Sequence, residues 1–512
     1  MGRVFQVLGL SGLLVTSLLS TQSFATEDAE GDSSAHDTKA DTHHNTEEPK
    51  AAEQPAPLIE PSATTMTAPA AAVAPPSAEV PPPAKPKFGD LSISGYFRGA
   101  FGASNEKGRM TCFALSNPAG LVSKWRLGNE CEVWSETHFT MVTYAGDDGV
   151  TASVHVMPTV YIPTTHIGYS PAGAVNSPLQ FTTSTGAVLY FPNLYVDIKG
   201  IPWLFGGTAW AGTRYYKRES IYISDFFYWN PSGVGAGIED ISLGQIVPAL
   251  EGMRLSYGAF AVDGEPAAPT DTTSPQLPSQ TDFGIRSDVQ LRGIHPWQTG
   301  ELQLGFQYIA NYSNDPATSG GWGATLQFVQ LVLGGDNKLA FQYGRGGGTG
   351  FGTLARFYYP DFSLRHDPSE SRIRIVEVLT IQPIDWLGGQ FAGMYQYDNN
   401  FLGNPGLKAT WYSVGGRVAV AFARHAKLLG EAGYDHATRS TTEQYLAKVT
   451  GAIALTSNRG FLSRPELRLF YTWAVWNKAA ATATVDSGRL YTDTYPNLLS
   501  GSIFGVQAET WY

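Results

Sequence analysis

From Phe88 onward, apolar and polar residues alternate along stretches of about ten residues, and clusters of Gly, Asn, Asp and Pro separate these stretches. In LSISGYFRGAFGA the two faces of the predicted strand are Ile93, Phe97 and Phe101 on one side and Ser92, Ser94, Tyr96 and Arg98 on the other. The pattern has no helical period. It predicts strand-turn-strand structure in which one face of each strand suits lipid and the other suits water.

The same parity recurs in ECEVWSETHFTM, TWYSVGGRVAV and RPELRLFYTWAVW, where the face opposite the apolar one combines rings with charges. Its members are Glu132, Trp134, Glu136 and His138, then Trp411, Ser413 and Arg417, then Glu466, Arg468, Thr472 and Trp476. Inward polar residues predict a water-filled lumen and hence a wide barrel, for which about 425 residues supply roughly 16 to 18 strands. We therefore expect an all-β fold, a transmembrane antiparallel β-barrel over residues 88–512.

The C-terminal FGVQAETWY predicts a last strand that closes the barrel and ends in the interfacial aromatic belt. The alternative is an ordinary edge strand, which lipid disfavours because its backbone groups would be unpaired. Composition agrees with a barrel, since charged residues are only 15% and aromatic residues 12% of the chain. The net charge of -11, with no basic stripe, argues against a nucleic-acid partner.

The N-terminus reads as a secretory signal peptide over residues 1–25, because Arg3 precedes the apolar run VLGLSGLLVTSLL and the small-x-small pattern at Ser23-Phe24-Ala25. The alternative is a buried or spanning helix, for which the apolar run is short. Export to an oxidising compartment makes a disulfide between Cys112 and Cys131 plausible. The alternative is two unpaired thiols, and the spacing does not suit a metal site.

Residues 26–87 are acidic at first and then rich in Pro and Ala, so neither part can bury a core. We interpret them as a disordered periplasmic extension. His36, His43 and His44 could bind a metal, but scattered histidines in such a tail are usually solvated.

The stretch WAGTRYYKRESIYISDFFYWNPSGVGAGIEDI is too rich in aromatic residues and glycines to be another strand. We expect its centre to fold into the lumen and narrow the pore, with Arg218, Asp225, Phe227 and Tyr228 as lining. The alternative is a surface loop around an aromatic cluster. Rings beside charges suit a sugar, because the CH face of a pyranose stacks on a ring while its hydroxyls bond to charged groups.

Motifs for catalysis are weak or missing. QYGRGGGTGFG lacks the Lys-Ser/Thr of a phosphate-binding loop and the strand-to-helix context, so it predicts a mobile external loop. The sequence contains no G-x-S-x-G, HExxH or CxxC motif. We expect no cofactor, and an enzyme with acids at the barrel rim is the minority hypothesis.

Over residues 88–512 the chain resembles the maltoporins, the carbohydrate-selective porins of Gram-negative outer membranes. The likeness rests on GYFRGAFG, KWRLGNECE with its upstream Cys112, the loop quoted above, GMYQYDNN, WYSVGGR, EAGYDHATRS, LSRPELRLF and FGVQAETWY. It implies an 18-stranded barrel that forms a homotrimer, a constriction loop, and a slide of aromatic rings that guides oligosaccharides past polar residues. It also implies that Cys112 and Cys131 form a disulfide within the first external loop.

The resemblance assigns site residues position by position. Tyr96, Trp134 and Trp411 match stacking aromatics of the slide, and the matches to its polar residues are Arg98, Arg126, Glu136, Arg218 and Asp225. The departures are Ala324 and Ala480 at two slide positions, Phe227 at the constriction tyrosine, and Ser220 at an acidic position. The aromatic that the neighbouring subunit donates has no aligned counterpart, although Phe181, Tyr190 and Phe191 lie nearby.

These observations predict an outer-membrane porin for the passive diffusion of maltose, maltooligosaccharides or related saccharides. The alternative is a general diffusion porin, or a channel for another small solute. Some sucrose-porin relatives carry an extra periplasmic segment, so the extension is a candidate for contact with the cell wall or another periplasmic partner.

Overall fold

The computed structural model describes residues 86–108, 110–115, 124–163, 181–182, 188–263, 283–314, 318–350, 364, 367–401, 404–486 and 494–512. The predicted signal peptide and nearly all of the predicted extension, with its three histidines, lie outside the described residues and stay predictions. In the part of the chain that the structure describes, no helix is long and apolar enough to cross a membrane.

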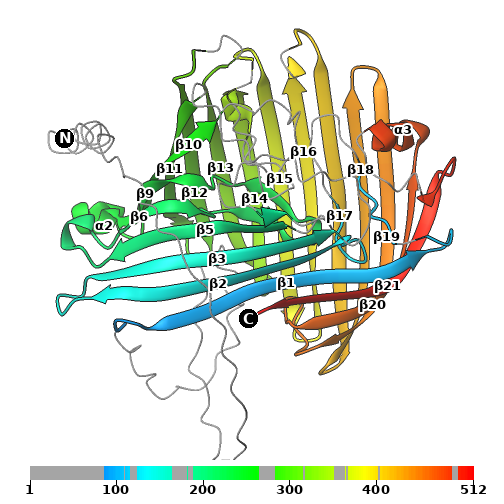
Figure 1. The fold of residues 1–512 in the computed structure, drawn as a ribbon, viewed down its shortest axis with the longest axis horizontal. Helices are drawn as coiled ribbons and strands as arrows, with labels where there is room; N and C mark the ends of the chain where they lie inside the picture. Colours follow the sequence, from blue (N-terminus) through cyan, green and yellow to red (C-terminus); the bar gives the residue numbers. More distant parts are fainter. Residues whose placement is uncertain are drawn as a thin grey trace, which may run out of the picture. The chain divides into compact units, whose positions relative to one another are not determined.

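The described chain is built almost entirely of antiparallel strands (Figure 1). In its first half these are β1 (Leu91–Ser104), β2 (Glu132–Ala145), β3 (Thr151–Pro163), β4 (Phe181–Thr182), β5 (Val188–Lys199), β6 (Thr208–Arg214), β7 (Glu219–Ile221), β8 (Phe226–Trp229), β9 (Gly233–Ser242), β10 (Arg254–Asp263) and β11 (Phe283–Trp297). The second half contains β12 (Gly300–Asn311), β13 (Gly321–Val332), β14 (Gly335–Gly346), β15 (Ser371–Ile384), β16 (Leu387–Asn399), β17 (Lys408–Ala423), β18 (Ala426–Arg439), β19 (Thr442–Thr456), β20 (Glu466–Trp476) and β21 (Ser500–Trp511).

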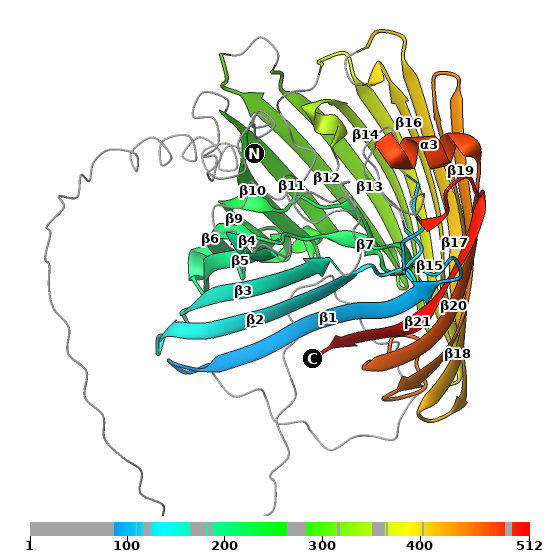
Figure 2. The ribbon, with the colours of Figure 1, turned by 45° about the vertical axis from the view of Figure 1, so that its right-hand side comes forward.

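The strands close into a barrel of 18 strands, because β1 pairs with β2 on one side and with β21 on the other. The two-residue β4 pairs only with the start of β5 and is not a wall strand. β7 and β8 form a separate hairpin. Figures 1 and 2 show β1 and β21, the two ends of the sequence of strands, lying side by side. The predicted fold class and closing strand are confirmed, and each of the 18 wall strands that the structure describes pairs with a neighbour on both sides.

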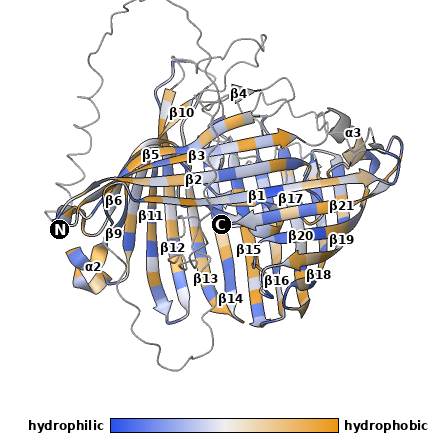
Figure 3. Cartoon of the chain, turned by 60° about the horizontal axis from the view of Figure 1, so that its bottom comes forward, coloured by the Kyte–Doolittle hydropathy of each residue, from blue (hydrophilic) through white to orange (hydrophobic). Residues whose placement is uncertain are grey.

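Side chains alternate between the outside of the barrel and its lumen, as the parity of the sequence predicts. On β20 the side chain of Leu469 is 64% exposed and that of Arg468 only 1%, and on β17 the corresponding values are 55% for Val414 and 2% for Arg417. Figure 3 shows hydrophobic and hydrophilic bands alternating along the strands. The outer face suits the hydrocarbon core of a membrane.

The two ends of the barrel differ in their connections. The end at which β1 starts and β21 stops has mostly short turns, such as residues 298–299, 333–334 and 424–425, which is typical of the periplasmic side. Longer connections, such as those from β1 to β2 and from β20 to β21, join the strands at the other end.

Helical segments are short and lie in connections. They are η2 (Pro202–Leu204), η3 (Tyr222–Ser224), α2 (Leu243–Ile246), η4 (Pro248–Leu250), η5 (Gly347–Thr349) and α3 (Lys478–Asp486). The prediction of a mobile external loop at residues 342–352 is wrong where the chain is described. Residues 342–346 belong to β14, and residues 347–350 are buried, since the side chain of Gln307 donates to the Gly348 carbonyl.

Candidate functional site

The chain between β6 and β9, residues 215–232, folds into the barrel and is called the lumen loop below. Its apolar residues Ile221, Ile223 and Phe226 are fully buried and belong to a hydrophobic cluster that also includes Trp125 of the connection between β1 and β2 and Trp411 of the wall. Asp225 ends η3 in the left-handed conformation, with φ 54°, which short polar side chains tolerate. The expected inward fold of this segment is therefore present.

The wall of the barrel holds the lumen loop through polar side chains. The Tyr228 hydroxyl donates to Gln327 Oε1 at 2.6 Å, and the backbone N–H of Ile223 donates to Gln390 Oε1 at 3.1 Å. Glu219 accepts from Arg292 and Lys338, both at 3.0 Å. Tyr228 has no exposed surface, so it anchors the loop to the wall rather than lining the lumen.

A second segment also turns inward, namely the described part of the connection between β1 and β2 (residues 105–108, 110–115 and 124–131), which is called the first loop. Cys112 and Cys131 form a disulfide, which confirms their pairing. The backbone N–H of Leu127 donates to Glu431 on β18, and that of Gly128 donates to Gln507 on β21, both at 2.9 Å. The bridged loop connects β1 and β2 at the end opposite the short turns, as the resemblance implied for the first external loop, and from there it folds against the inner wall.

Two residues fit this loop closely to the wall. Trp125 is 1% exposed and lies so near Gly433 that a Cβ there would be 2.1 Å from the indole. Gly128 has a φ of +60°, and a Cβ on it would meet Thr472 Oγ1 at 2.5 Å. Both contacts depend on glycine, because any larger residue at either position would need the neighbouring atoms to move.

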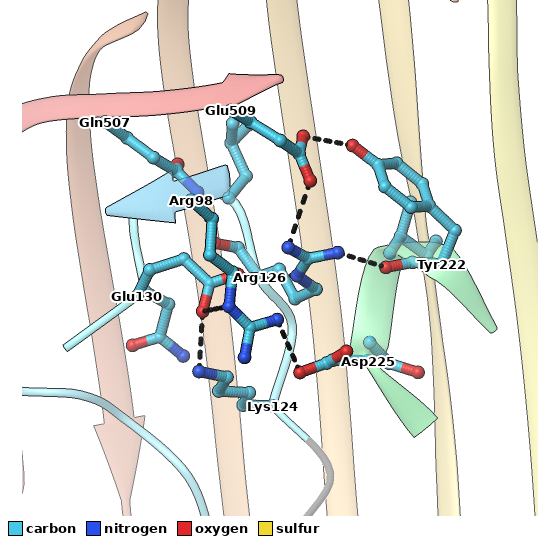
Figure 4. A network of polar contacts seen from close by, with 12 residues as sticks. Arg98, Lys124, Arg126, Glu130, Tyr222, Asp225, Gln507 and Glu509 are labelled. Carbon is cyan, nitrogen blue, oxygen red and sulfur yellow. Dashed lines mark hydrogen bonds and ion pairs between the residues drawn. The ribbon is translucent and has the colours of Figure 1, made fainter. Parts of the chain in front are cut away.

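The two inward loops and β1 meet in a network of charges (Figure 4). Arg98 on β1 donates to Asp225 of the lumen loop at 2.7 Å and to Glu132 at 3.0 Å. Lys124 donates to Glu130 at 2.6 Å, and Arg126 donates to the same carboxylate at 2.5 Å. Burial would raise the pKa of Glu130, but Arg98, Lys124 and Arg126 together hold that pKa well below its ordinary value.

Glu509 of β21 lies at the centre of the neighbouring part of the network. Arg126 of the first loop and Tyr96 of β1 donate to its Oε1 at 3.0 and 2.9 Å. Its Oε2 accepts from the Tyr222 hydroxyl, from Arg464 at 2.9 Å and from Arg468 at 2.6 Å. Figure 4 shows Tyr222 and Arg126 both directed at this carboxylate.

The three predicted stacking residues all point into the barrel, but they differ in exposure. Trp134 and Trp411 are each 2% exposed, whereas Tyr96 is half-buried. The Trp411 ring packs edge-on against Phe226 of the lumen loop, with centroids 5.3 Å apart. The guanidinium of Arg98 lies 5.6 Å from the centre of the Trp134 ring.

Trp134 belongs to an aromatic cluster on β2, β3 and β5. Its ring centroid is 6.1 Å from that of Tyr161 and 5.8 Å from that of Tyr190, both in edge-on geometry. Tyr96 packs against the same cluster. Tyr190, which the sequence placed near the missing slide aromatic of a neighbouring subunit, thus packs beside Trp134 of its own chain.

Arg218 and Phe227 lie together on the half-buried side of the lumen loop. The Arg218 guanidinium is 3.4 Å from the centre of the Tyr215 ring and 4.6 Å from that of Phe227. Its charge acts on Glu136 of β2, which is also half-buried. The structure therefore brings Arg218, Phe227 and Glu136 to one part of the lumen, and Arg98, Arg126 and Asp225 to the adjoining network.

Two alignments with slide positions do not hold. Ala324 lies on the outer face of β13, because it pairs with the exposed Tyr343, while its neighbour Thr325 is the inward residue that bonds to Gln342. Ala480 lies in α3 and is buried in the connection between β20 and β21. Because neither alanine lies on the inner wall, neither occupies a position of the slide. The two alanines are therefore no evidence that the slide lacks two aromatic residues.

Reasoning from the sequence missed several residues of the site, namely Glu130, Tyr161, Tyr222, Arg464 and Glu509. Strand parity could have placed Tyr161 and Glu509 on the inward face. Their partners come from distant parts of the sequence, and parity gives no information about those.

A family model described as LamB porin matches residues 91–512. Among solved structures, OccAB1 of Acinetobacter baumannii is 11% identical and has a TM-score of 0.41, with 83% of this chain and 97% of that chain covered. OmpT of Vibrio cholerae in its trimer form is 10% identical with a TM-score of 0.36, covering 83% and 100%. OpdK of Pseudomonas aeruginosa with vanillate is 12% identical with a TM-score of 0.40, covering 83% and 99%.

Proposed function

The chain belongs to the LamB porin family, and from that premise we propose that it carries sugars by passive diffusion through its lumen. It is a porin of the Gram-negative outer membrane. The solutes that fit the proposal best are maltose, maltooligosaccharides or related saccharides.

The observation that carries the proposal is the inner surface around β1, β2 and the lumen loop. There the rings of Tyr96 and Phe227 are half-buried, and Glu136 and Arg218 lie beside them. Rings can stack on the apolar face of a sugar, and the charged groups can exchange hydrogen bonds with its hydroxyls. Several weak sites of this kind allow a solute to enter and to leave, which passage through a channel requires.

The roles proposed for single residues come from the family resemblance. Tyr96, Trp134 and Trp411 would stack on sugar rings. As the sugar moves through the channel, its hydroxyls would form hydrogen bonds in turn with the polar residues Arg98, Arg126, Glu136, Arg218 and Asp225. Phe227 would set the narrowest passage. Trp134 and Trp411 would need neighbouring side chains to shift before a sugar could reach their faces, because both are 2% exposed in this structure.

Two partners complete the proposal. The family resemblance favours a homotrimer, and residues 26–87 would contact the cell wall or another periplasmic partner.

The experiment is sugar block of single-channel current in a planar bilayer, with maltooligosaccharides and sucrose titrated separately. We expect concentration-dependent block by maltooligosaccharides that weakens about tenfold in Trp134→Ala, which corresponds to about 1.4 kcal/mol. Trp473→Ala is the matched control, because Trp473 is 46% exposed on the outer face of β20. Unblocked current with every sugar would reject the proposal.

The second candidate is a general diffusion porin, or a channel for another small solute. The observation in its favour is the coverage of Trp134 by Tyr161 and Tyr190 and of Trp411 by Phe226. If these rings serve only to pack the interior, small solutes would pass according to size, and no sugar would block the current.

A further inference from the structure

The Glu509 carboxylate gathers donors from five separate segments of the chain. They are Tyr96 of β1, Arg126 of the first loop, Tyr222 of the lumen loop, Arg464 of the turn between β19 and β20, and Arg468 of β20. Glu509 is 1% exposed, so water does not compete for these bonds. Charge-assisted bonds of this kind are roughly twice as strong as neutral ones.

Three of these segments do not belong to the barrel wall. The first loop and the lumen loop start from the end with long connections, whereas residues 457–465 form a turn at the opposite, periplasmic end. Phe461 of this periplasmic turn packs edge-on against Tyr222, with ring centroids 6.3 Å apart, and Arg464 donates to the Tyr222 hydroxyl. The lumen loop thus contacts the first loop, which starts from the end with long connections, and the periplasmic turn, which starts from the opposite end. Tyr222 makes both contacts.

The lumen loop is held differently on its two sides. On the side of β11 and β14, the carboxylate belongs to the loop, since Glu219 accepts from Arg292 and Lys338 of the wall. On the side of β1 and β21, the wall supplies the carboxylate of Glu509, and Tyr222 binds it through a single hydroxyl. Asp225, three residues further on, is held by Arg98 at 2.7 Å.

We propose that Glu509 is the positioning residue of the constriction, fixing the lumen loop at Tyr222 together with the first loop and the periplasmic turn. The proposal rests on the porin function but not on sugar as the solute. Without the negative charge, the guanidinium groups of Arg126, Arg464 and Arg468 would lose their shared counter-charge and repel one another. Tyr222 of the lumen loop would then lose its bond to the wall carboxylate, Arg98 would remain as the ion-pair partner of Asp225 on this side, and the passage would widen.

The test is single-channel conductance and ion selectivity of Glu509→Gln in potassium chloride, without sugar. Glutamine keeps the size of the side chain and removes its charge. We expect conductance to rise at least twofold, with frequent current fluctuations and a shifted reversal potential in a salt gradient. A purely structural role would lower the yield of folded protein and leave the conductance of inserted channels unchanged.

Asp398→Asn is the matched control, because Asp398 is also buried and ion-paired, accepting from Arg372 at 2.5 Å between neighbouring wall strands. We expect it to keep the wild-type conductance. Folding is checked for each variant by the heat-dependent shift of folded barrels in gel electrophoresis.

Tyr222→Phe tests the same bond with less disturbance, since it removes one hydroxyl and leaves the carboxylate with its guanidinium partners. It should change conductance in the same direction as Glu509→Gln, and in the double variant it should add little, because both act through one contact. If Glu509→Gln does not fold, Tyr222→Phe alone decides. Wild-type conductance and selectivity in the folded variants would overturn the proposal. Absence of sugar block in the wild type would reject only the sugar proposal.

Discussion

Glu130 illustrates how one carboxylate can hold a loop inside a barrel. It has no exposed surface, and it is paired with Lys124 and Arg126 of the first loop and lies 3.7 Å from Arg98 of the wall. Buried ion pairs contribute little net stability when complete, but removing one partner leaves an uncompensated charge and costs about 3–5 kcal/mol. Glu130 therefore matters chiefly because its cationic partners depend on it.

The first prediction concerns pH at this residue. Because the pKa of Glu130 is held well below its ordinary value, its stabilisation of the docked loop is present above the ordinary carboxyl pKa of about 4.3 and is lost as the pH falls toward the lowered value. We expect Glu130→Gln to speed reduction of the Cys112–Cys131 disulfide by a phosphine reductant about tenfold or more at pH 7.

The difference from the wild type should shrink as the pH is lowered below about 4, since the carboxyl of the undocked loop, with its ordinary pKa, then takes up a proton and the docked state loses part of its advantage. Reduction rates measured between pH 7 and pH 3 test this. A ratio that does not change with pH would contradict the role given to the charge of Glu130.

How far the sequence could predict the site is clearest for single residues. Parity placed Arg98, Trp134 and Trp411 correctly on the inward face, because side-chain direction alternates along every strand. It could not show that Glu509 would collect Tyr222, Arg126 and Arg464, since barrel closure and loop folding bring these together from 45 to 383 residues away.

Among elements of the fold, the first loop depends most on its close fit to the wall. The backbone of Gly128 adopts φ +60°, and its N–H donates to Gln507 of β21 at 2.9 Å. A side chain there would be strained and would also collide with Phe470 and Thr472 of β20. The loop can dock only if this position stays glycine.

We therefore predict that Gly128→Ala undocks the first loop while the barrel still folds. The left-handed backbone alone costs roughly 1–2 kcal/mol, and the collision adds to that. The loop should become susceptible to limited proteolysis. Gly406→Ala is the matched control, because Gly406 has φ +76° but open space around it. Equal protease resistance of the two variants would mean that the contact with β20 is unimportant.

The lumen loop shows why an element can be recognised while its arrangement is not. Its density of rings and glycines predicted an inward loop, and the structure contains one, whose buried Ile221, Ile223 and Phe226 share a hydrophobic cluster with the first loop and the wall. The sequence did not reveal that Tyr228 would bind Gln327 of the wall rather than line the passage. Which ring of such a cluster faces inward depends on packing that no periodic pattern encodes.

For the whole molecule, composition and parity predicted a wide β-barrel, and the structure confirms it with 18 strands. The strand number came from the family resemblance, because alternating stretches alone allowed roughly 16 to 18. The prediction of an open, water-filled lumen was less complete. Inward charges such as Arg417, Glu431 and Lys448 are buried, because the first loop lies over them and they pair with one another.

The central claim is that the protein is a porin for sugars of the maltose series. Comparing the entry rates of two trisaccharides distinguishes it from a general diffusion porin. Maltotriose and raffinose have the same mass, so a passage that sorts by size admits them at similar rates, whereas stacking rings and hydroxyl partners favour the sugar whose shape they fit. The direct measurement is the swelling rate of liposomes that contain the purified protein, in isosmotic solutions of each trisaccharide. The account predicts that maltotriose enters several-fold faster than raffinose, and equal rates would contradict it.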